Sequence, residues 1–535
     1  MRTSIHPYIM LPKIDLVLIN AERQSVNWQY GQVYTTAYSV DDMRQNIQRL
    51  VQESKAEWIL FWDADLGEIN ETLTAELAQT NLDVWHAGLR LGTSGLPNAL
   101  NYINPAWIYN KDATPDVSSS SFRLSLKASL IRLSVLKEVL PVIYPQYTTV
   151  DAMGLCMGYA IIRKGGMMRY HHALVKQEAE KITLSERDEW IFIKQFFPAK
   201  WHWWVVLNKK GLLNNIRNKS SVNNVAYIHL KPDLHSSAIK HAAIPKTVSV
   251  LAPTLDRYSY LKNELDQLSV QTIMPLEVLV TDQTDDARRQ TIDANEYTAI
   301  NLKWFPQSEK GQCIAWNKLI EEAKGEYLLF LGDDADNITP DFIEKLLGTA
   351  QYYNADMVAS NVVELGLPPK SVNPFYYMSD TFPITLIKRE VVVKAGGMDM
   401  FFNRNIRADY DLALRCHQLG AFMVFDSSAL IDHHRAPVGG LRTYKARAIT
   451  NRTSKNSITK FAEPTSSELF LLKKYFGATE FINYVRIKYF DQLMINGGWV
   501  KRLVRLLVFT GKLPAIRKRY KANLTAAINE LQSRY

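Results

Sequence analysis

Two stretches of the chain combine an apolar run with an abrupt acidic end. Residues 56–66 read AEWILFWDADL, and residues 325–336 read GEYLLFLGDDAD. Each stretch lies between two segments whose apolar residues recur every three or four positions, a spacing typical of amphipathic helices. These helical segments are residues 41–55, 72–79, 311–324 and 340–351. The alternation of helices with buried strands predicts an α/β fold in both halves of the chain.

Later segments repeat in the same order. SLIRLSVLKEV (129–139) corresponds to TLIKREVVVKAG (385–396), and the helix–strand pair of residues 158–175 corresponds to that of residues 413–431. A constant order of similar segments indicates a tandem duplication.

The two copies differ at their beginnings. The second copy starts with a strand, a helix and a strand, in residues 247–271 and 276–286. The first copy starts at IDLVLIN (14–20), which corresponds best to the second of those strands, so we expect the first copy to lack the opening strand and helix. The predicted domains are a truncated copy (1–205), an irregular polar connector (206–246), a complete copy (247–440) and a helical tail (441–535). In the tail, Gly497–Gly498 and Pro514 predict breaks.

Composition narrows the class of protein. The chain has 535 residues, of which 47% are hydrophobic and 22% charged, values typical of globular domains rather than disordered chains. Its three cysteines are scattered, which disfavours a zinc cluster or a disulfide framework and suggests a reducing cytosol. The chain contains no run of 18 or more apolar residues, so we expect no membrane-spanning helix. The net charge of +9 fits an anionic partner, but no nucleic-acid-binding motif accompanies it, so we expect no nucleic acid.

The acidic end of the second apolar stretch is the first candidate site. Asp333, Asp334 and Asp336 follow a predicted strand, and ligands of open α/β sheets bind at the carboxyl ends of strands. Close carboxylates repel one another unless a cation neutralises them, and Mg²⁺ or Mn²⁺ shared with substrate phosphates would do so. A solvated acidic turn that caps the next helix is the alternative. The similar Asp63 and Asp65 in the first copy favour the metal–diphosphate site.

Seven segments of the second half occur in the order found in a known family. They are SVLAPTLDR (249–257), VLVTDQTDD (278–286), GQCIAWN (311–317), YLLFLGDDAD (327–336), GGMD (396–399), DYDLALR (409–415) and HH (433–434). With them, residues 247–437 resemble the family 2 glycosyltransferases, which have the GT-A fold. The first half resembles a shortened, degenerate copy of that fold.

The resemblance implies a site for a nucleotide-sugar donor and a divalent metal, Mn²⁺ or Mg²⁺. The residues implied to bind the donor are Pro253, Thr254, Asp256, Arg257, Asp282, Asp333 and Asp334. The residues implied to hold the metal are Asp334, Asp336, His433 and His434. Asp409 would be the general base, with Asp411 supporting it. A single base opposite the leaving group implies inversion at the anomeric carbon.

The sequence departs from the family pattern at three positions. Ala408 stands where an acid usually precedes the base, Ala315 stands where an arginine usually precedes Asn317 by two positions, and Gly332 stands where an acid is common. In the first copy, no acid matches Asp409, and Asp151 fits poorly in register. We therefore expect the first copy not to transfer sugar by the usual route. The rival hypothesis is a bifunctional transferase with two active domains.

Residues 498–521 contain eight Lys and Arg residues, no acid and a run of apolar side chains. This composition fits a basic amphipathic helix on an anionic membrane surface, or a helix packed on the catalytic domain. The leading hypothesis is an inverting glycosyltransferase that acts on a glycan or lipid-linked acceptor in cell-surface polysaccharide synthesis. We expect it in the cytoplasm, at the inner face of the membrane if the tail binds lipid. A non-catalytic carbohydrate-binding scaffold is the alternative from another class.

Overall fold

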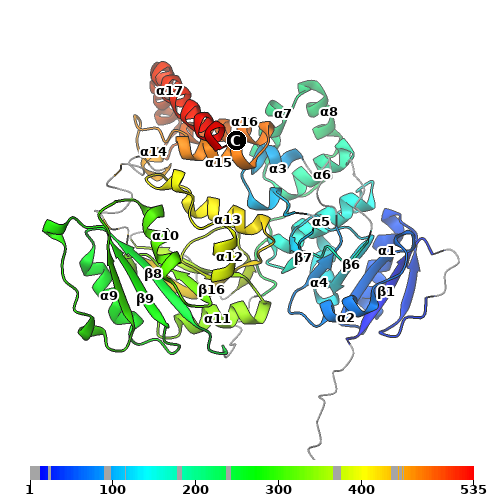
Figure 1. Cartoon of the computed structure of the whole chain (residues 1–535). Helices are drawn as coiled ribbons and strands as arrows, with labels where there is room; N and C mark the ends of the chain where they lie inside the picture. Colours follow the sequence, from blue (N-terminus) through cyan, green and yellow to red (C-terminus); the bar gives the residue numbers. More distant parts are fainter. Residues whose placement is uncertain are drawn as a thin grey trace, which may run out of the picture. The chain divides into compact units, whose positions relative to one another are not determined.

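A computed structural model gives the fold of two compact units (Figure 1). Unit 1 contains residues 1–98 and 112–236, and unit 2 contains residues 99–111 and 237–535. The structure describes residues 12–21, 26–88, 98–114, 116–176, 184–235, 243–365, 375–434, 436, 444, 449 and 451–534. A segment of the first half thus belongs to the second unit, and no single cut of the chain separates the two units.

Unit 1 is built on a seven-stranded sheet with the order β2-β1-β3-β6-β4-β7-β5. Its strands are β1 (Ile14–Ile19), β2 (Val33–Thr36), β3 (Trp58–Asp63), β4 (Val84–His86), β5 (Ser119–Ser120), β6 (Ala128–Arg132) and β7 (Met168–Tyr170). Every residue of β1 and β3 is buried, as expected for central strands covered on both faces. Its helices are α1 (Val40–Glu53), α2 (Glu71–Ala78), α4 (Leu133–Val139), α5 (Val150–Arg163), α6 (Glu186–Phe196), α7 (Ala199–Asn208) and α8 (Leu212–Ser221).

Unit 2 is built on a nine-stranded sheet with the order β10-β9-β8-β11-β15-β13-β16-β12, and β14 pairs with β16. Its strands are β8 (Val248–Thr254), β9 (Glu277–Asp282), β10 (Leu302–Pro306), β11 (Tyr327–Phe330), β12 (Ala335–Asp336), β13 (Met357–Glu364), β14 (Tyr376–Met378), β15 (Thr385–Lys388) and β16 (Met423–His433). Its helices up to the end of the sheet are α3 (Asn98–Ile103), α9 (Tyr258–Leu268), α10 (Gln312–Glu322), α11 (Phe342–Tyr353), α12 (Arg389–Lys394) and α13 (Ala408–Gln418). The prediction of an α/β fold is confirmed in both halves.

The two sheets correspond strand by strand. The order β2-β1-β3-β6-β4-β7-β5 matches β10-β9-β11-β15-β13-β16-β14, and every neighbouring pair keeps its direction. The second sheet has β8 inserted between β9 and β11, whereas β1 pairs directly with β3 in the first. The shared order supports a duplication, and the position of β8 agrees with an opening strand that the first copy lacks.

The C-terminal region is helical, as predicted. It contains α14 (Asn451–Lys455), α15 (Ser466–Tyr475), α16 (Ala478–Leu493) and α17 (Trp499–Arg534). Gly497 and Gly498 lie between α16 and α17, but the predicted break at Pro514 is wrong, because α17 continues through it. Pro514 is on the exposed side of the helix, where the missing hydrogen bond leaves a carbonyl that water can solvate. No helix in the described part of the chain is long and apolar enough to cross a membrane.

The segment predicted to be an irregular connector also differs from expectation, because it contains α8. The polar composition concealed this helix, which has one buried asparagine. Asn215 is 1% exposed and donates to the carbonyl of Lys209, 2.9 Å away, at the end of α7. Its side chain thus satisfies an unpaired carbonyl at a helix end and joins the two helices.

Candidate functional site

The loop after β8 carries the first group of predicted donor-binding residues. Pro253 and Thr254 are the last two residues of β8 and pair with Thr281 and Asp282 of β9. Asp256 follows in a left-handed conformation with φ of 59°, which aspartate tolerates better than most residues. Its backbone N–H donates to the Thr284 hydroxyl at 2.9 Å, which joins the loop to the chain after β9.

Arg257, the next residue, joins this loop to the end of β11. Its Nη1 atom lies 2.8 Å from a carboxylate oxygen of Asp333 and 3.0 Å from one of Asp334. Burial, together with the neighbouring Asp334, raises the pKa of Asp333 to about 6, although the guanidinium of Arg257 opposes this rise. One guanidinium therefore offsets part of the negative charge of the acidic pair that the sequence predicted to bind a cation.

Asp282 ends β9 in the predicted position and is completely buried. Its carboxylate accepts hydrogen bonds from the Tyr258 hydroxyl at 2.8 Å and from the backbone N–H of Thr284 at 2.9 Å. Arg289 lies 3.4 Å away. Because Tyr258 begins α9, this bond fixes the loop after β8 against the loop after β9.

The two histidines each meet one carboxylate. His433 ends β16 and lies 3.0 Å from Asp334, while the adjacent His434 lies 2.7 Å from Asp336. Antiparallel pairing of β12 with β16 places these side chains together. The sequence motifs that are about 100 residues apart therefore meet, as the resemblance implied.

Asp336 is bound to two side chains of α9. Its Oδ1 atom accepts from Asn263 at 2.8 Å and from Gln267 at 2.7 Å, both on α9. Burial would raise the pKa of Asp336, but the bonds from Gln267, the Asn337 N–H, His434 and Asn263 hold it well below its ordinary value. Asp336 thus fastens the acidic turn to α9.

Among the described residues, no three His, Cys, Asp or Glu side chains are grouped so that they alone could hold a metal ion. Asp334 and His433 offer one carboxylate and one imidazole next to each other. Mg²⁺ and Mn²⁺ sites that serve phosphate substrates commonly use one or two protein ligands and take the rest from phosphates and water. This pair therefore fits a metal that is held jointly with a donor diphosphate.

A buried glutamate that sequence reasoning missed lies beside this cluster. Glu264 of α9 is completely buried, and burial followed by the nearby Asp333 and Asp334 raises its pKa well above the ordinary value. Burial and the acidic neighbours therefore favour the protonated, uncharged form of this side chain. A helical glutamate surrounded by LKN and LDQ gives no sequence signal of this burial.

Asp409 lies in the first turn of α13 and is exposed. Among the described residues, no hydrogen bond or ion pair engages its carboxylate. Arg407 precedes the helix in a left-handed conformation with φ of 85° and is paired with Glu468 at 3.1 Å. An exposed carboxylate can reach the hydroxyl of a bound acceptor, as a general base must.

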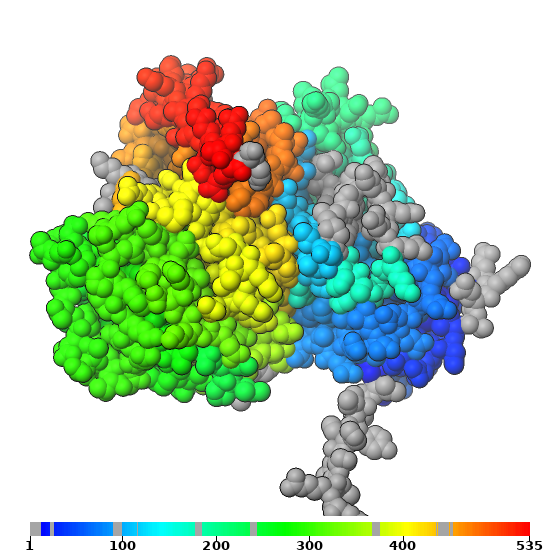
Figure 2. All heavy atoms as spheres, viewed as in Figure 1, coloured from blue at the N-terminus to red at the C-terminus, as the bar shows by residue number. Residues whose placement is uncertain are grey.

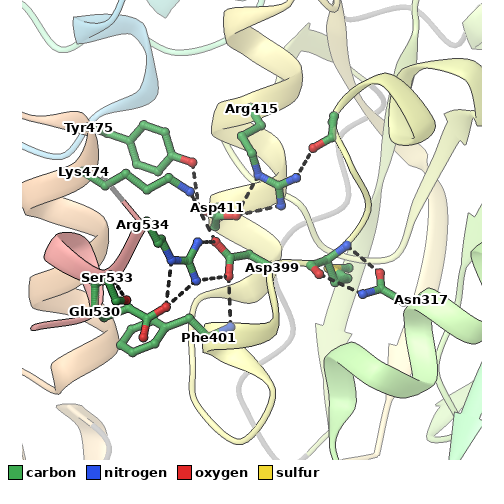
Figure 3. Close-up of polar contacts among 12 residues, drawn as sticks. Asn317, Asp399, Phe401, Asp411, Arg415, Lys474, Tyr475, Glu530, Ser533 and Arg534 are labelled. Atoms are coloured by element: carbon green, nitrogen blue, oxygen red, sulfur yellow. Dashed lines mark hydrogen bonds and ion pairs between the residues drawn. The ribbon is translucent and has the colours of Figure 1, made fainter. Parts of the chain in front are cut away.

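Asp411 lies two residues after Asp409 on α13 and has different surroundings (Figure 3). It is completely buried, and its carboxylate accepts from Arg415 at 2.8 Å, from the Tyr475 hydroxyl at 2.7 Å and from Lys474 at 3.2 Å. These contacts fasten α13 to α15. The position suits a residue that supports Asp409 by holding the helix, and not one that meets substrate.

The GGMD motif is held by two residues from distant parts of the chain. Asn317 donates to the carbonyl of Met398 at 2.9 Å and accepts from its N–H at 2.7 Å. The carboxylate of Asp399 accepts hydrogen bonds of 2.7 Å and 2.8 Å from the guanidinium of Arg534, the last described residue of α17 (Figure 3). The sequence identified the motif, but nothing in it predicted a partner 135 residues away.

Unit 1 places acids at positions equivalent to those of unit 2. Arg132 pairs with Trp58 just before α4, and Lys388 pairs with Tyr327 just before α12. This shared register aligns Asp65 with Asp334 and Asp63 with Gly332. The first copy therefore has an acid where the second has Gly332.

Asp151 also fits better than the sequence indicated. It is the second residue of α5, as Asp409 is the second residue of α13, and these two helices precede the corresponding strands β7 and β16. The Tyr38 hydroxyl donates to Asp151 at 2.8 Å. Unlike Asp409, the carboxylate of Asp151 is thus already engaged.

Comparison with known proteins agrees with the motifs. Residues 249–405 match the model of the family described as Glycosyl transferase family 2, which confirms the resemblance of the second half. The chain is 24% identical over 224 residues to the O-antigen biosynthesis protein RfbC of Myxococcus xanthus, covering 35% of this chain and 17% of that protein. It is 34% identical over 106 residues to the putative glycosyltransferase EpsH of Bacillus subtilis, covering 19% of this chain and 30% of that protein. The matched region thus spans less than a third of either relative.

Two solved structures align with about half of this chain. The mannosyltransferase PcManGT from Pyrobaculum calidifontis, in complex with GDP-Man and Mn²⁺, aligns with 55% of this chain and 89% of its own at 15% identity, with a TM-score of 0.33. Residues 1–349 of S. aureus TarS, in complex with UDP-GlcNAc, align with 54% of this chain and 92% of their own at 16% identity, with a TM-score of 0.34.

Proposed function

We propose that unit 2, with a glycosyltransferase family 2 match over residues 249–405, transfers a sugar from a nucleotide-sugar donor to an acceptor hydroxyl with inversion at the anomeric carbon. The observation that carries the proposal is the connected set of strand ends. Arg257, Asp282 and Asp334 come from the ends of β8, β9 and β11 and are linked by hydrogen bonds and ion pairs, with Asp409 accessible on α13.

The donor would occupy the loops after these strands. Asp282 would accept hydrogen bonds from the base or ribose, with Pro253, Thr254 and Asp256 along the nucleotide. Arg257 is placed to bind the diphosphate, whose oxygens a guanidinium binds in place of the carboxylates it now contacts. A divalent metal held by Asp334 and His433 would stabilise the negative charge that grows on the leaving diphosphate.

Asp409 would act as the general base. It would take the proton of the acceptor hydroxyl as that oxygen attacks the anomeric carbon from the side opposite the diphosphate. The bond to the diphosphate breaks as the new glycosidic bond forms, so one attack gives one inversion. A nucleotide diphosphate is already a good leaving group, so no second carboxylate acid is needed.

A screen of nucleotide sugars with Mn²⁺, with nucleotide release as the readout, tests the proposal. We expect one donor to be turned over and Asp409→Asn to lower kcat by a factor of about 10²–10⁴, the usual contribution of a general base. Glu390→Gln, an exposed carboxylate on α12, is the matched control and should keep full activity. NMR of the product gives the anomeric configuration, and a retained configuration or an active Asp409→Asn variant would contradict the proposal.

The acceptor class and location are proposed from α17. Its first turns expose large apolar side chains between basic ones, with Trp499 75% and Leu507 65% exposed. Figure 2 shows this helix on the outside of unit 2, coloured red. Apolar and basic side chains on one exposed helix fit the surface of an anionic membrane, and therefore a lipid-linked acceptor at the inner face of the membrane. The name of the M. xanthus relative agrees with a role in surface polysaccharide synthesis.

Liposome flotation tests this location. We expect the protein to float with vesicles that contain phosphatidylglycerol and not with neutral phosphatidylcholine vesicles. The double variant Trp499→Ser, Leu507→Ser should lose flotation, whereas Leu213→Ser, an exposed leucine on α8, should retain it. Equal flotation of all three proteins would exclude α17 as the membrane contact.

We further propose that unit 1 does not transfer sugar by the same route. Within its described residues, the sheet has no strand between β1 and β3, so the loop that carries Arg257 in unit 2 has no counterpart there. The bifunctional alternative is favoured by one observation, the equivalent positions of Asp65 and Asp151.

A further inference from the structure

The segment of residues 99–111 is an integral part of unit 2, although the residues before and after it belong to unit 1. The Trp107 indole N–H donates to Asp380 at 3.1 Å, and the Tyr109 hydroxyl donates to the carbonyl of Ser379 at 2.6 Å. The Tyr410 hydroxyl of α13 donates to the carbonyl of Ala106. The segment is therefore bound to the strand region before β15 and to the helix that carries the proposed base.

A cavity of about 210 Å³ lies where this segment meets α13, α15 and α16. Most of its polar and aromatic lining comes from six side chains, those of Trp107, Asp380, Arg407, Tyr410, Glu468 and Tyr484. Usual ligand pockets measure about 300–1,000 Å³, so this cavity has room for a single ring and not for a whole nucleotide sugar.

The cavity adjoins the proposed base. Arg407 and Tyr410 line it, and Asp409 lies between them in the chain. Arg407 adopts a left-handed backbone conformation without being glycine, a strain that proteins retain mostly at functional sites. Glu468 and the Tyr484 hydroxyl hold its guanidinium at 3.1 Å and 3.4 Å, so the strained residue has a fixed side chain.

The charges of the lining balance one another. Glu468 is paired with Arg407 and with Lys488, whose Nζ atom lies 2.7 Å away, so its carboxylate is used within the protein. Asp380 is the second acid, and within the described part of the chain one hydrogen bond, from Trp107, reaches it. Lys488 does not line the cavity, but it pairs with Glu468; counted with it, two acids and two bases leave no net charge for an ionic ligand. A neutral ligand with several hydroxyls suits the exposed edges of Asp380 and Arg407, and its apolar face suits the aromatic rings.

We propose that this cavity is the subsite for the terminal sugar ring of a neutral acceptor glycan, and that Trp107 and Asp380 determine acceptor specificity. The inference rests on the proposed glycosyl transfer. It means that residues 99–111, from the first half of the chain, select the acceptor for the active site of the second half.

Acceptor kinetics with the full-length protein provide the test. We expect Asp380→Asn to raise the KM for acceptor about tenfold or more, the usual effect of losing a hydrogen bond to a charged group, while kcat and the KM for donor change little. Asp491→Asn on α16, an exposed carboxylate outside the cavity, is the matched control. Unchanged acceptor KM in Asp380→Asn would overturn the inference and leave the proposed transferase intact.

A second measurement does not depend on turnover. Saturation-transfer difference NMR with methyl glucoside, methyl galactoside and methyl N-acetylglucosaminide probes the cavity in the wild-type protein. We expect a signal from at least one glycoside that Trp107→Phe and Asp380→Asn weaken, in variants whose circular dichroism shows that they remain folded. A lack of signal, or equal signals in wild type and Asp380→Asn, would overturn the inference. A signal without turnover of any nucleotide sugar would support the subsite while contradicting the proposed function.

Discussion

At the scale of single residues, the acids of unit 2 divide by burial. Asp409 is exposed and unengaged among the described residues, whereas Asp411, two positions later, is completely buried between α13 and α15. Their spacing in one helical turn puts one on the surface and the other against Lys474 and Tyr475. The two aspartates of this motif therefore have different roles: Asp409 is accessible to a ligand, and Asp411 holds α13 to α15.

This difference predicts opposite effects on stability. Asp411→Ala removes a completely buried carboxylate that pairs with Arg415 and Lys474 and accepts from Tyr475, so the free energy of unfolding should fall by about 3–5 kcal/mol. Asp409→Asn changes an exposed group and should alter it by less than about 0.5 kcal/mol. Urea unfolding followed by circular dichroism measures both. Equal stability of the two variants would contradict the structural role of Asp411.

The sequence marked the candidate site residues more clearly than their partners. Asp282, Asp333 and Asp334 could be found because apolar strands that end in carboxylates are a local pattern. Arg534, Lys474 and Glu264 could not be found, since their roles depend on contacts with residues far away in the chain. The correspondence of Asp151 with Asp409 was missed for a related reason. Each is the second residue of its helix, α5 or α13, but the sequences around them are not similar enough to align.

At the scale of elements, α17 is the main departure from the predicted helices. A proline inside a 36-residue helix was expected to end it, but contacts with α15 and α16 hold both sides of Pro514 in line. The end of the helix is fixed by Arg534, which pairs with Asp399 (Figure 3). This ion pair therefore joins the loop of the GGMD motif (396–399) to the end of α17.

The Asp399–Arg534 pair predicts a pH dependence. Burial would raise the pKa of Asp399, but the hydrogen bond from Arg534, the Phe401 N–H and the charge of Lys474 lower it to about 2. A lowered pKa in the folded state gives stability that is present above the ordinary value of 3.8 and lost as the pH falls towards 2. Because the Arg534 side chain is 33% exposed, solvent limits the gain to about 1 kcal/mol or less.

Arg534→Gln should therefore lower the free energy of unfolding at pH 7 by up to about 1 kcal/mol. The difference from wild type should narrow as the pH falls from about 4 to about 2, because Asp399 becomes protonated in both proteins. Arg517→Gln, an exposed position on the same helix, is the control and should match wild type at each pH. A pH-independent difference would show that Arg534 acts through packing alone.

At the scale of the whole molecule, the two sheets show what duplication conserved. Strand order and direction survive at seven positions, so the repeated order of segments predicted the architecture correctly. The role of residues 99–111 was not predictable, because the residues that contact it are distant in the sequence and no local pattern marks an exchange between units.

The carboxylate of Asp151 is already bound by Tyr38, and in the described part of unit 1 no strand lies between β1 and β3. We therefore predict that unit 1 does not transfer sugar. The double variant Asp63→Ala, Asp65→Ala should release nucleotide at the wild-type rate and form the same product. Linkage determination of the product by NMR, with circular dichroism to verify folding, checks this. Loss of one of two linkages would identify unit 1 as a second active transferase.

The membership of residues 99–111 in unit 2 also constrains how the chain is made. The Tyr109 hydroxyl bonds to a carbonyl 270 residues later, so the segment leaves the ribosome long before its partner strand exists. Long-range contacts of this kind form late and slowly. Translation thus supplies Trp107 on one side of the cavity well before Asp380, Tyr410 and Tyr484 on the other, so this wall of the proposed subsite must wait for its partners.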